Sequence, residues 1–267
     1  MRASFWRAAA VPAVALLVAG CSAPGSPAPA PPPAGAAFDY QLGGAYPPPG
    51  GVEVVVRDRS AAPLEGGYSI CYVNGFQTQP GEADEWPVDA LLRREDAPVV
   101  DPQWPDEILL DVSTPERRAE IAAVVTPWIQ ECADAGFDAV EFDNLDTFAR
   151  SGGALTVDDN VALAAELVAA AHRAGLAAAQ KNAAEHAERF SHDAGFDFAI
   201  TEECAAFQEC DAYEAVYGPH VLDIEYTDAL PRRFDEVCAD PAVPQSVVLR
   251  DRGLVSPSDA GYFFESC

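Results

Sequence analysis

The sequence predicts a single-domain α/β fold of the (β/α)8 TIM barrel type. Short β-rich runs recur along the chain, and most are followed by a helical stretch, which is typical of a parallel sheet joined by helices. Eight such runs fall within residues 38–267, a length that suits one barrel. A doubly wound open sheet is the alternative, but no Gly-x-Gly-x-x-Gly turn follows any strand, so its dinucleotide-binding form loses support.

The strands are expected in order at residues 40–42, 52–57, 69–73, 138–143, 176–181, 198–202, 221–226 and 246–250. A further short run at 108–111 belongs to the long connection before the fourth strand. Helices are clearest at 115–135 and 157–174. The first has Ser113 or Thr114 as N-cap and ends near Gly136, and the second follows Thr156 and ends at Gly175.

The N-terminus predicts export and lipid anchoring. A short basic segment precedes an apolar run that ends in Val-Ala-Gly-Cys at Cys21, which resembles the bacterial lipoprotein signal box. We therefore expect a signal peptide at 1–20 and a lipidated Cys21, followed to residue 37 by a proline-rich and alanine-rich spacer. An ordinary secretory signal with a chance cysteine is the alternative. The protein should face the outside of the cell membrane, anchored or secreted.

Composition limits the possible partners. The chain of 267 residues carries 43 acidic and 16 basic side chains, a formal charge of -27. This acidity argues against nucleic acid, because phosphate binding needs a surplus of Lys and Arg. It favours a cationic or neutral ligand. We expect a monomer that needs no cofactor.

Six cysteines follow the predicted lipidation site, and an even number in an exported protein suggests up to three disulfides. Fifteen pairings are possible, so the sequence alone does not fix them. Cys204 and Cys210 are close across a loop, Cys238 with Cys267 would tie down the C-terminus, and Cys71 with Cys132 is left by elimination. No CxxC or His-rich spacing is present, so we expect no metal at these cysteines.

Polar side chains gather where the predicted strands end, which in TIM barrels is the face that carries the active site. Strand side chains alternate faces, so Glu141 shares a face with Asp143, and Asp223 shares one with Glu225. If that face is the barrel interior, Asp143, Lys181, Glu202 and Glu225 meet at one mouth. Solvated strand-end residues are the alternative, but four on consecutive strands favour a functional site.

Two carboxylates at such a mouth are what glycoside hydrolysis requires. One attacks or stabilises the anomeric carbon, and the other donates a proton to the leaving oxygen. We expect Asp143 to be the nucleophile, kept ionised by Lys181, and Glu202 to be the acid/base, with a pKa raised by burial and by nearby acids. The acidic cluster around Asp143 lacks the spacing of calcium loops, so no metal is expected there.

Several motifs together resemble one family. They are GFDAVEFDNLD at 136–146, AHRAGL at 171–176, KN at 181–182, EEC at 202–204 with EC at 209–210, EY at 225–226, and the shorter ICY at 70–72 and LDV at 110–112. This set, in this order, resembles the endo-α-1,4-polygalactosaminidase family, glycoside hydrolase family 114. The resemblance implies a (β/α)8 barrel, retaining cleavage within a galactosamine-rich polysaccharide, and Asp143 and Glu202 as the catalytic pair.

An anionic cleft would suit that substrate, because galactosamine without an N-acetyl group is cationic near neutral pH. The expected substrate contacts are Asp58, Tyr72, Asp111, Asn144, Asp146, Lys181, Asn182, Glu225 and Tyr226. Asp111 and Asp146 could equally be helix-capping or loop residues. The chain departs from the family pattern at Val56, where an aspartate is usual, and at Asn74-Gly75 after the third strand. Both departures concern the substrate side rather than the catalytic pair.

Two other functions remain open. A carbohydrate-binding lipoprotein without turnover would suit the lipid anchor and spacer equally well, but it would have no reason to place two carboxyls across a sugar bond. A glycosidase of related fold acting on a neutral polysaccharide is the other, and chemical N-acetylation of the substrate would separate it. No Gly-x-Ser-x-Gly elbow is present, so serine hydrolase chemistry has little support.

Overall fold

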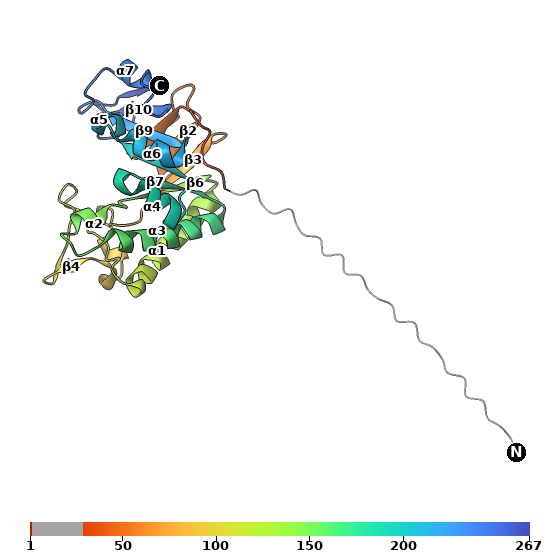
Figure 1. Ribbon diagram of the computed structural model, residues 1–267, viewed down its shortest axis with the longest axis vertical. Coiled ribbons are helices and arrows are strands. Elements are labelled where there is room, and N and C mark those ends of the chain that lie inside the picture. Colours follow the sequence, from red (N-terminus) through yellow and green to blue (C-terminus); the bar gives the residue numbers. More distant parts are fainter. Residues whose placement is uncertain (2–28) are drawn as a thin grey trace.

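A computed structural model of the chain describes residue 1 and residues 29–267 (Figure 1). The predicted signal peptide, apart from its first residue, and the predicted lipidation site Cys21 lie outside the described residues. Within the described part of the chain, no helix is both long enough and apolar enough to cross a membrane.

The architecture is the predicted (β/α)8 barrel in a single domain. Eight parallel strands follow one another in chain order around the main sheet, and a ninth, β11, joins its end antiparallel to β10. The strands of this sheet are β1 (Phe38–Gln41), β2 (Val54–Asp58), β3 (Tyr68–Asn74), β6 (Ala139–Asp143), β7 (Ala177–Lys181), β8 (Phe198–Glu202), β9 (Val221–Tyr226), β10 (Ser246–Arg250) and β11 (Phe264–Ser266). All eight expected strands are present, and the expected first and last residue of each differs from the observed one by at most two residues.

The two long helices begin and end as the sequence predicts, and they pack against each other on the outside of the barrel (Figure 1). Thr114 caps α1 (Pro115–Ala135) and Thr156 forms a capping box on α3 (Val157–Ala174). Gly136 and Gly175 take the left-handed conformation just past the two helix ends, which glycine adopts without strain. The shorter helices are α2 (Thr147–Arg150), α4 (Ala187–Arg189), α5 (Cys204–Phe207), α6 (Cys210–Tyr217), α7 (Phe234–Cys238), the 3-10 turns η1 (Ala83–Glu85), η2 (Val88–Ala90) and η3 (Ala184–His186), and the π-turn η4 (Phe190–Ala194).

The expected short run at 108–111 is not a strand. It forms isolated bridges to Gln77, Leu91 and Val100 within the long connection between β3 and α1. That connection also carries the two-stranded ribbon β4 (Arg93–Arg94) and β5 (Ala97–Pro98). The connection overhangs the carboxyl ends of the strands and supplies several side chains of the cleft described below.

Alternation along the strands separates two cores. One fills the barrel with side chains such as Tyr40, Ile70, Ile200 and Ile224. The other lies between the barrel and its helices. Which face a strand residue occupies therefore decides whether it points at the barrel mouth or at the surrounding helices.

A buried ion pair helps to close the barrel. Arg250 on β10 lies 2.8 Å from Asp39 on β1, both side chains are fully buried, and the two strands lie against each other. The Arg250 guanidinium also donates to the backbone oxygens of Phe263 and Val255. Buried pairs of this kind add little net stability, because desolvation of the two charges offsets their attraction.

The disulfides confirm the favoured pairing of the six cysteines. Cys71 on β3 is bonded to Cys132 on α1, Cys204 is bonded to Cys210, and Cys238 is bonded to the C-terminal Cys267. The first ties the barrel to its outer helix layer, the second closes the loop after β8, and the third secures the C-terminal segment.

Candidate active site

The site lies at the carboxyl ends of β6, β7 and β8, on inward-facing positions. Residues 139, 141 and 143 alternate inward on β6, as do 177, 179 and 181 on β7 and 198, 200 and 202 on β8, because their apolar members lie in the barrel core. This register brings Asp143, Lys181 and Glu202 to the same mouth, as the sequence predicts.

Lys181 is the centre of the charge cluster. Its Nζ atom lies 3.5 Å from Asp143 Oδ2, 3.2 Å from Glu202 Oε2 and 3.6 Å from Glu141 Oε1. Burial alone would lower the pKa of Lys181, but the three carboxyl groups outweigh it and raise that pKa well above its ordinary value. The ammonium group therefore stays charged, with the three carboxyl groups around it.

Asp143 is held on both of its oxygens. Tyr72 donates its hydroxyl to Oδ2 at 2.7 Å, and the backbone N–H of Asn144 donates to Oδ1 at 2.7 Å. Asn144 adopts a left-handed backbone conformation with φ 67°, which Asn tolerates better than most residues. The side chain of Asp143 is thus oriented by its neighbours before any substrate binds.

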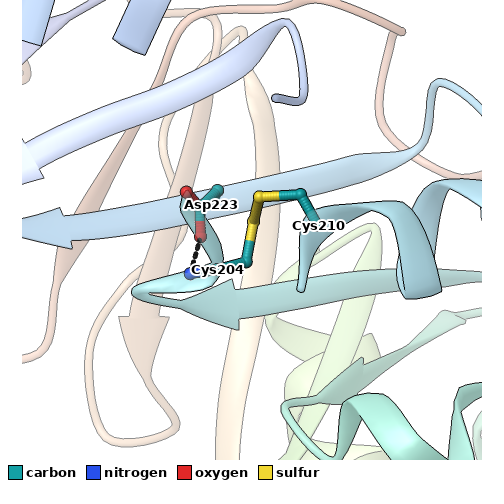
Figure 2. A group of neighbouring side chains, drawn as sticks. All are labelled: Cys204, Cys210 and Asp223. Atoms are coloured by element: carbon teal, nitrogen blue, oxygen red, sulfur yellow. Dashed lines mark hydrogen bonds between the residues drawn. A yellow bond between two sulfur atoms is a disulfide. The ribbon is translucent and has the colours of Figure 1, made fainter. Parts of the chain in front are cut away.

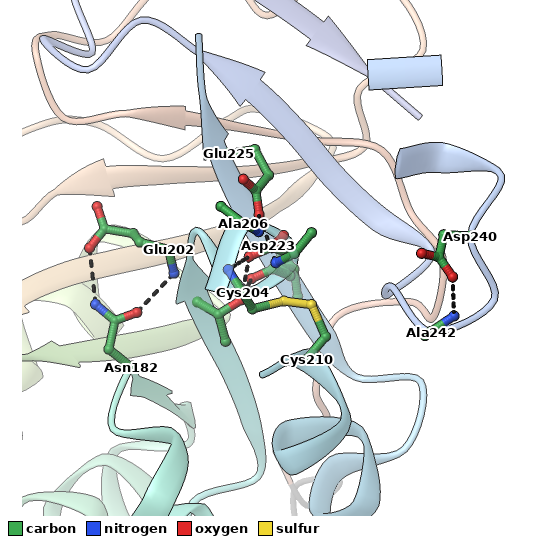
Figure 3. Close-up of a disulfide and its surroundings, with 12 residues drawn as sticks. Asn182, Glu202, Cys204, Ala206, Cys210, Asp223, Glu225, Asp240 and Ala242 are labelled. Carbon is green, nitrogen blue, oxygen red and sulfur yellow. Dashed lines mark hydrogen bonds between the residues drawn. A yellow bond between two sulfur atoms is a disulfide. The ribbon is translucent and has the colours of Figure 1, made fainter. Parts of the chain in front are cut away.

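Glu202 is held by Asn182 and Tyr226. Asn182 donates its side-chain amide to Glu202 Oε2 at 3.0 Å and accepts from the Glu202 backbone N–H at 2.8 Å, a reciprocal pair visible in Figure 3. Tyr226 donates its hydroxyl to Oε1. These contacts fix the carboxyl at the mouth of the barrel.

The direction of the Glu202 pKa differs from the prediction. Burial raises it, but the Lys181 ammonium and the hydrogen bonds from Tyr226 and Asn182 outweigh burial and leave the pKa below its usual range. The prediction of a raised pKa was wrong, because it counted the nearby acids and did not count the shared lysine and the two donors.

Glu141 lies beneath this pair and is fully buried. Tyr40 donates its hydroxyl to Oε1 at 2.8 Å, and Lys181 in turn lies 3.2 Å from the Tyr40 oxygen. Burial is the main cause that raises the pKa of Glu141 to about 8, against the opposing effect of Lys181. Glu141 therefore carries a proton at neutral pH, which leaves the positive charge of Lys181 to Asp143 and Glu202.

The carboxyl pair opens into a cleft with a volume of about 570 Å³. Among the predicted substrate contacts, those that line it are Tyr72, Asn144, Asp146, Lys181, Asn182 and Tyr226. Residues that the sequence did not single out are Tyr40, Gln77, Asp101, Gln103, Trp104, Glu107, Arg150, Glu203 and Arg252. Most of these belong to loops, whose sequence carries no periodic signal.

Three predicted contacts lie elsewhere. Asp58 accepts from the backbone N–H of Ser60 at 2.9 Å, as a turn residue does, and Asp111 accepts from Ser113 N–H and pairs with Arg117 at the start of α1. Neither lines the cleft. Asp111 is therefore a loop residue just before α1, one of the roles that the sequence left open, while Thr114 caps the helix.

Glu225 is the third, and its placement corrects the prediction that it joins the mouth. On β9 the inward positions are Leu222, Ile224 and Tyr226, so Asp223 and Glu225 face outward. Glu225 accepts from the backbone N–H groups of Ala205 and Ala206, at 2.8 and 3.2 Å, below the loop that follows Glu202 (Figure 3). It supports the loop after Glu202 without reaching the cleft.

Asp223 has a similar supporting role. Its Oδ1 atom accepts from Thr201 Oγ1 at 2.7 Å and from the Cys204 backbone N–H at 3.1 Å (Figure 2). Asp223 also lies close to the sulfurs of Cys204 and Cys210, a grouping that could suggest a metal site. Those sulfurs are bonded to each other, so neither is a thiolate ligand, and the cluster is a structural clamp.

The fold and this pair define the class of protein. Two oriented carboxyl groups, on strands separated by one strand in a barrel mouth, are an arrangement that glycosidases of the two-carboxylate type also have.

The comparisons agree with that class. The model of glycoside-hydrolase family GH114 matches residues 20–267, so the chain belongs to this family and is a glycoside hydrolase. No curated protein sequence matches it. Among solved structures, Aspergillus fumigatus Ega3 in complex with galactosamine superposes with a TM-score of 0.72 at 22% identity, over 91% of this chain and 99% of that one. The glycoside hydrolase domain of Pseudomonas aeruginosa PelA gives 0.53 at 15% identity, over 83% and 96%.

Proposed function

We propose that this protein is an extracytoplasmic, retaining, endo-acting hydrolase of α-1,4-linked galactosamine-rich polysaccharide. The observation that carries the proposal is the pair Asp143 and Glu202 around one ammonium group at the mouth of a GH114 barrel. The galactosamine bound to the structural neighbour Ega3 supports the choice of sugar. The acidic lining of the cleft supports a cationic substrate.

The spacing of the two carboxyl groups supports a retaining mechanism. Oδ2 of Asp143 and Oε2 of Glu202 both lie within 3.5 Å of Lys181 Nζ. They are therefore at most about 7 Å apart, a bound that admits the spacing of about 5–5.5 Å in retaining enzymes and excludes most of the wider inverting range. Asp143 attacks the anomeric carbon while protonated Glu202 gives its proton to the leaving oxygen.

Lys181 couples the two steps of this mechanism. While Asp143 is ionised, it competes with Glu202 for the ammonium group and favours a proton on Glu202. Once Asp143 is esterified it carries no charge, Lys181 acts more fully on Glu202, and the pKa of Glu202 falls further. Glu202 then accepts a proton from the water that hydrolyses the intermediate. Because the pKa of Glu202 is already lowered in the free enzyme, acidic pH should favour the first step.

Reducing-end release from a panel of acetylated and deacetylated polysaccharides tests the proposal. We expect hydrolysis of deacetylated galactosamine polymer, loss of activity after N-acetylation, and a rate that decreases from mildly acidic pH toward alkaline pH. Asp143→Asn and Glu202→Gln should each lower kcat by about a thousandfold or more. Wild-type hydrolysis by both variants would overturn the assignment, activity that survives N-acetylation would favour a neutral substrate, and tight binding without turnover would favour a binding protein.

We also propose that the enzyme is tethered through a lipid on Cys21. Residues at the start of the described chain lie against the amino ends of the strands, since Tyr68 donates to the backbone oxygen of Ala30 at 2.7 Å and His220 Nδ1 lies 3.1 Å from that of Pro32. This is the end of the barrel opposite the cleft, so a tether would leave the cleft facing away from the membrane. Cys21→Ala should move the enzyme from the membrane fraction to the soluble fraction, and an unchanged distribution would contradict the anchor.

A further inference from the structure

A second cavity of about 420 Å³ adjoins the cleft and has no role in the mechanism above. The loops after β6, β7 and β8 form it, and it shares Asp146, Asn182, Glu202 and Glu203 with the cleft. Its remaining walls include Phe148, Glu185, Phe207 and Glu209. The two cavities therefore meet at the proposed acid/base.

The positions of the catalytic pair distinguish the two cavities. Asp143 lines only the cleft, so the sugar whose anomeric carbon is attacked must lie there. Glu202 lines both cavities. This is the position required of a group that protonates the oxygen joining two sugars. The next sugar along the polymer, on the leaving-group side, therefore falls in the second cavity.

Phe207 supplies this cavity with a surface for a sugar ring. Its side chain is 67% exposed, which is unusual for a phenylalanine, and it lies on α5. The disulfide of Cys204 and the contacts of Glu225 with the backbone hold that helix in place. The apolar face of a pyranose can stack on such a rigid ring. Phe148 offers less, because it already packs edge-on against His186 at 5.3 Å.

The charges in the cavity select the kind of sugar. Among its five carboxylates, Asp146 pairs with Arg150, Glu202 pairs with Lys181, and Glu203 pairs with Arg252. Glu185 and Glu209 form no ion pair with any residue of the described chain, and the lining contains no Lys or Arg. Burial and then the charge of Glu185 raise the pKa of Glu209. An ammonium group placed between these two acids would relieve their repulsion.

We propose that this cavity is the binding site for the first sugar on the leaving-group side, with Phe207 as its stacking platform and with Glu185 and Glu209 selecting a free 2-amino group. The proposal deepens the proposed function and rests on it. It predicts that cleavage of a partially acetylated polymer releases products whose new non-reducing ends carry a free amine, because that end is the sugar that occupied this cavity.

The test compares matched pairs of variants on partially N-acetylated polygalactosamine. Phe207→Ala should raise KM about five- to tenfold, whereas Phe263→Ala, which removes a half-exposed ring outside both cavities, should not. Glu209→Gln should increase the share of N-acetylated non-reducing ends among the products, whereas Glu214→Gln, on the same side of the barrel in α6, should leave it at the wild-type value. Variants that match their controls in both measurements would overturn the subsite.

Failure of the proposed function would be seen separately, as an absence of hydrolysis by the wild-type enzyme. Isothermal titration of a galactosamine oligomer into Asp143→Asn protein then decides the subsite on its own. Affinity that decreases when Phe207→Ala is added supports it, and affinity that stays unchanged refutes it.

Discussion

Two clusters of carboxyl groups lie on neighbouring strands of the barrel and have opposite surroundings. Glu141, Asp143 and Glu202 face inward around the ammonium group of Lys181. Asp223 and Glu225 face outward, and their oxygens accept from backbone N–H groups and a threonine hydroxyl. The first cluster lies at a cleft, and the second lies under a loop.

The difference shows how a buried acid acquires its role. The Lys181 ammonium lies beside Asp143 and Glu202 next to a cavity, and it lowers the pKa of Glu202 against the raising effect of burial. Within the described part of the chain, no ion pair joins Asp223 or Glu225 to a cation. Burial is the main cause that raises both pKa values, and the charge of Glu225 adds to it at Asp223, as the charge of Glu203 does at Glu225. The inward cluster is therefore suited to chemistry, and the outward one holds in place the turn that carries Glu202.

Removal of the shared cation should have the largest effect. Lys181→Met leaves Asp143 and Glu202 without their common partner, so Glu202 should take up a proton more readily. We expect kcat to fall by about a hundredfold to a thousandfold and the pH profile to shift toward alkaline pH, because Lys181 is the main group that lowers the pKa of Glu202. Steady-state rates between about pH 4 and pH 9 measure both effects. An unshifted profile would show that Lys181 has only a packing role.

The two clusters show which features of the fold and of the site the sequence alone predicts. Strand ends and helix caps are local or periodic signals, and they located the barrel strands, α1 and α3, whereas cysteine spacing favoured one disulfide pairing without fixing it. The cleft brings together Asp143 and Glu202 as predicted, because parallel strands end at one mouth. The face of β9 was not determined, since Leu222 and Ile224 alternate with Asp223 and Glu225 and either pair could face a barrel interior.

The loops were also beyond prediction from the sequence. Trp104 and Asp101 reach the cleft from the long connection between β3 and α1, where no repeat of apolar residues shows which side chains turn inward. Likewise, the lowered pKa of Glu202 depends on distances to Lys181, Tyr226 and Asn182, and these distances follow from tertiary packing.

Glu141→Gln tests the neutral member of the inward cluster. The pKa of Glu141 is raised in the folded protein to about 8, whereas in the unfolded chain it is near 4.3. The folded state therefore binds more protons between these values, and its stability decreases as pH rises from the lower value to the upper one. The Gln side chain of the variant does not titrate, so the stability of the variant should not decrease in this way as pH rises. Chemical denaturation should find it more stable than the wild type above pH 8, by on the order of a few kcal/mol, with little difference near pH 4.

Tyr40→Phe is the control for this prediction. It should not remove the dependence of the free energy of unfolding on pH. It removes the hydrogen bond to Glu141 but keeps the ionisable carboxyl, so stability should still decrease across the same pH range. A wild-type curve that is level between these pH values would contradict the neutral state of Glu141.

Glu225→Gln should have the smallest effect, and it separates support of the loop from contact with substrate. The amide keeps an oxygen that can accept from Ala205 and Ala206, and it offers Asp223 a permanent donor. Because both acids have raised pKa values, their contribution to stability is complete at low pH and is lost as pH rises through those values. The variant should therefore be equal to the wild type in KM and more stable in alkaline solution, by about 1 kcal/mol. A KM that increases as it does for Phe207→Ala would instead mean that Glu225 reaches the sugar, and the division between the inward and outward clusters would no longer hold.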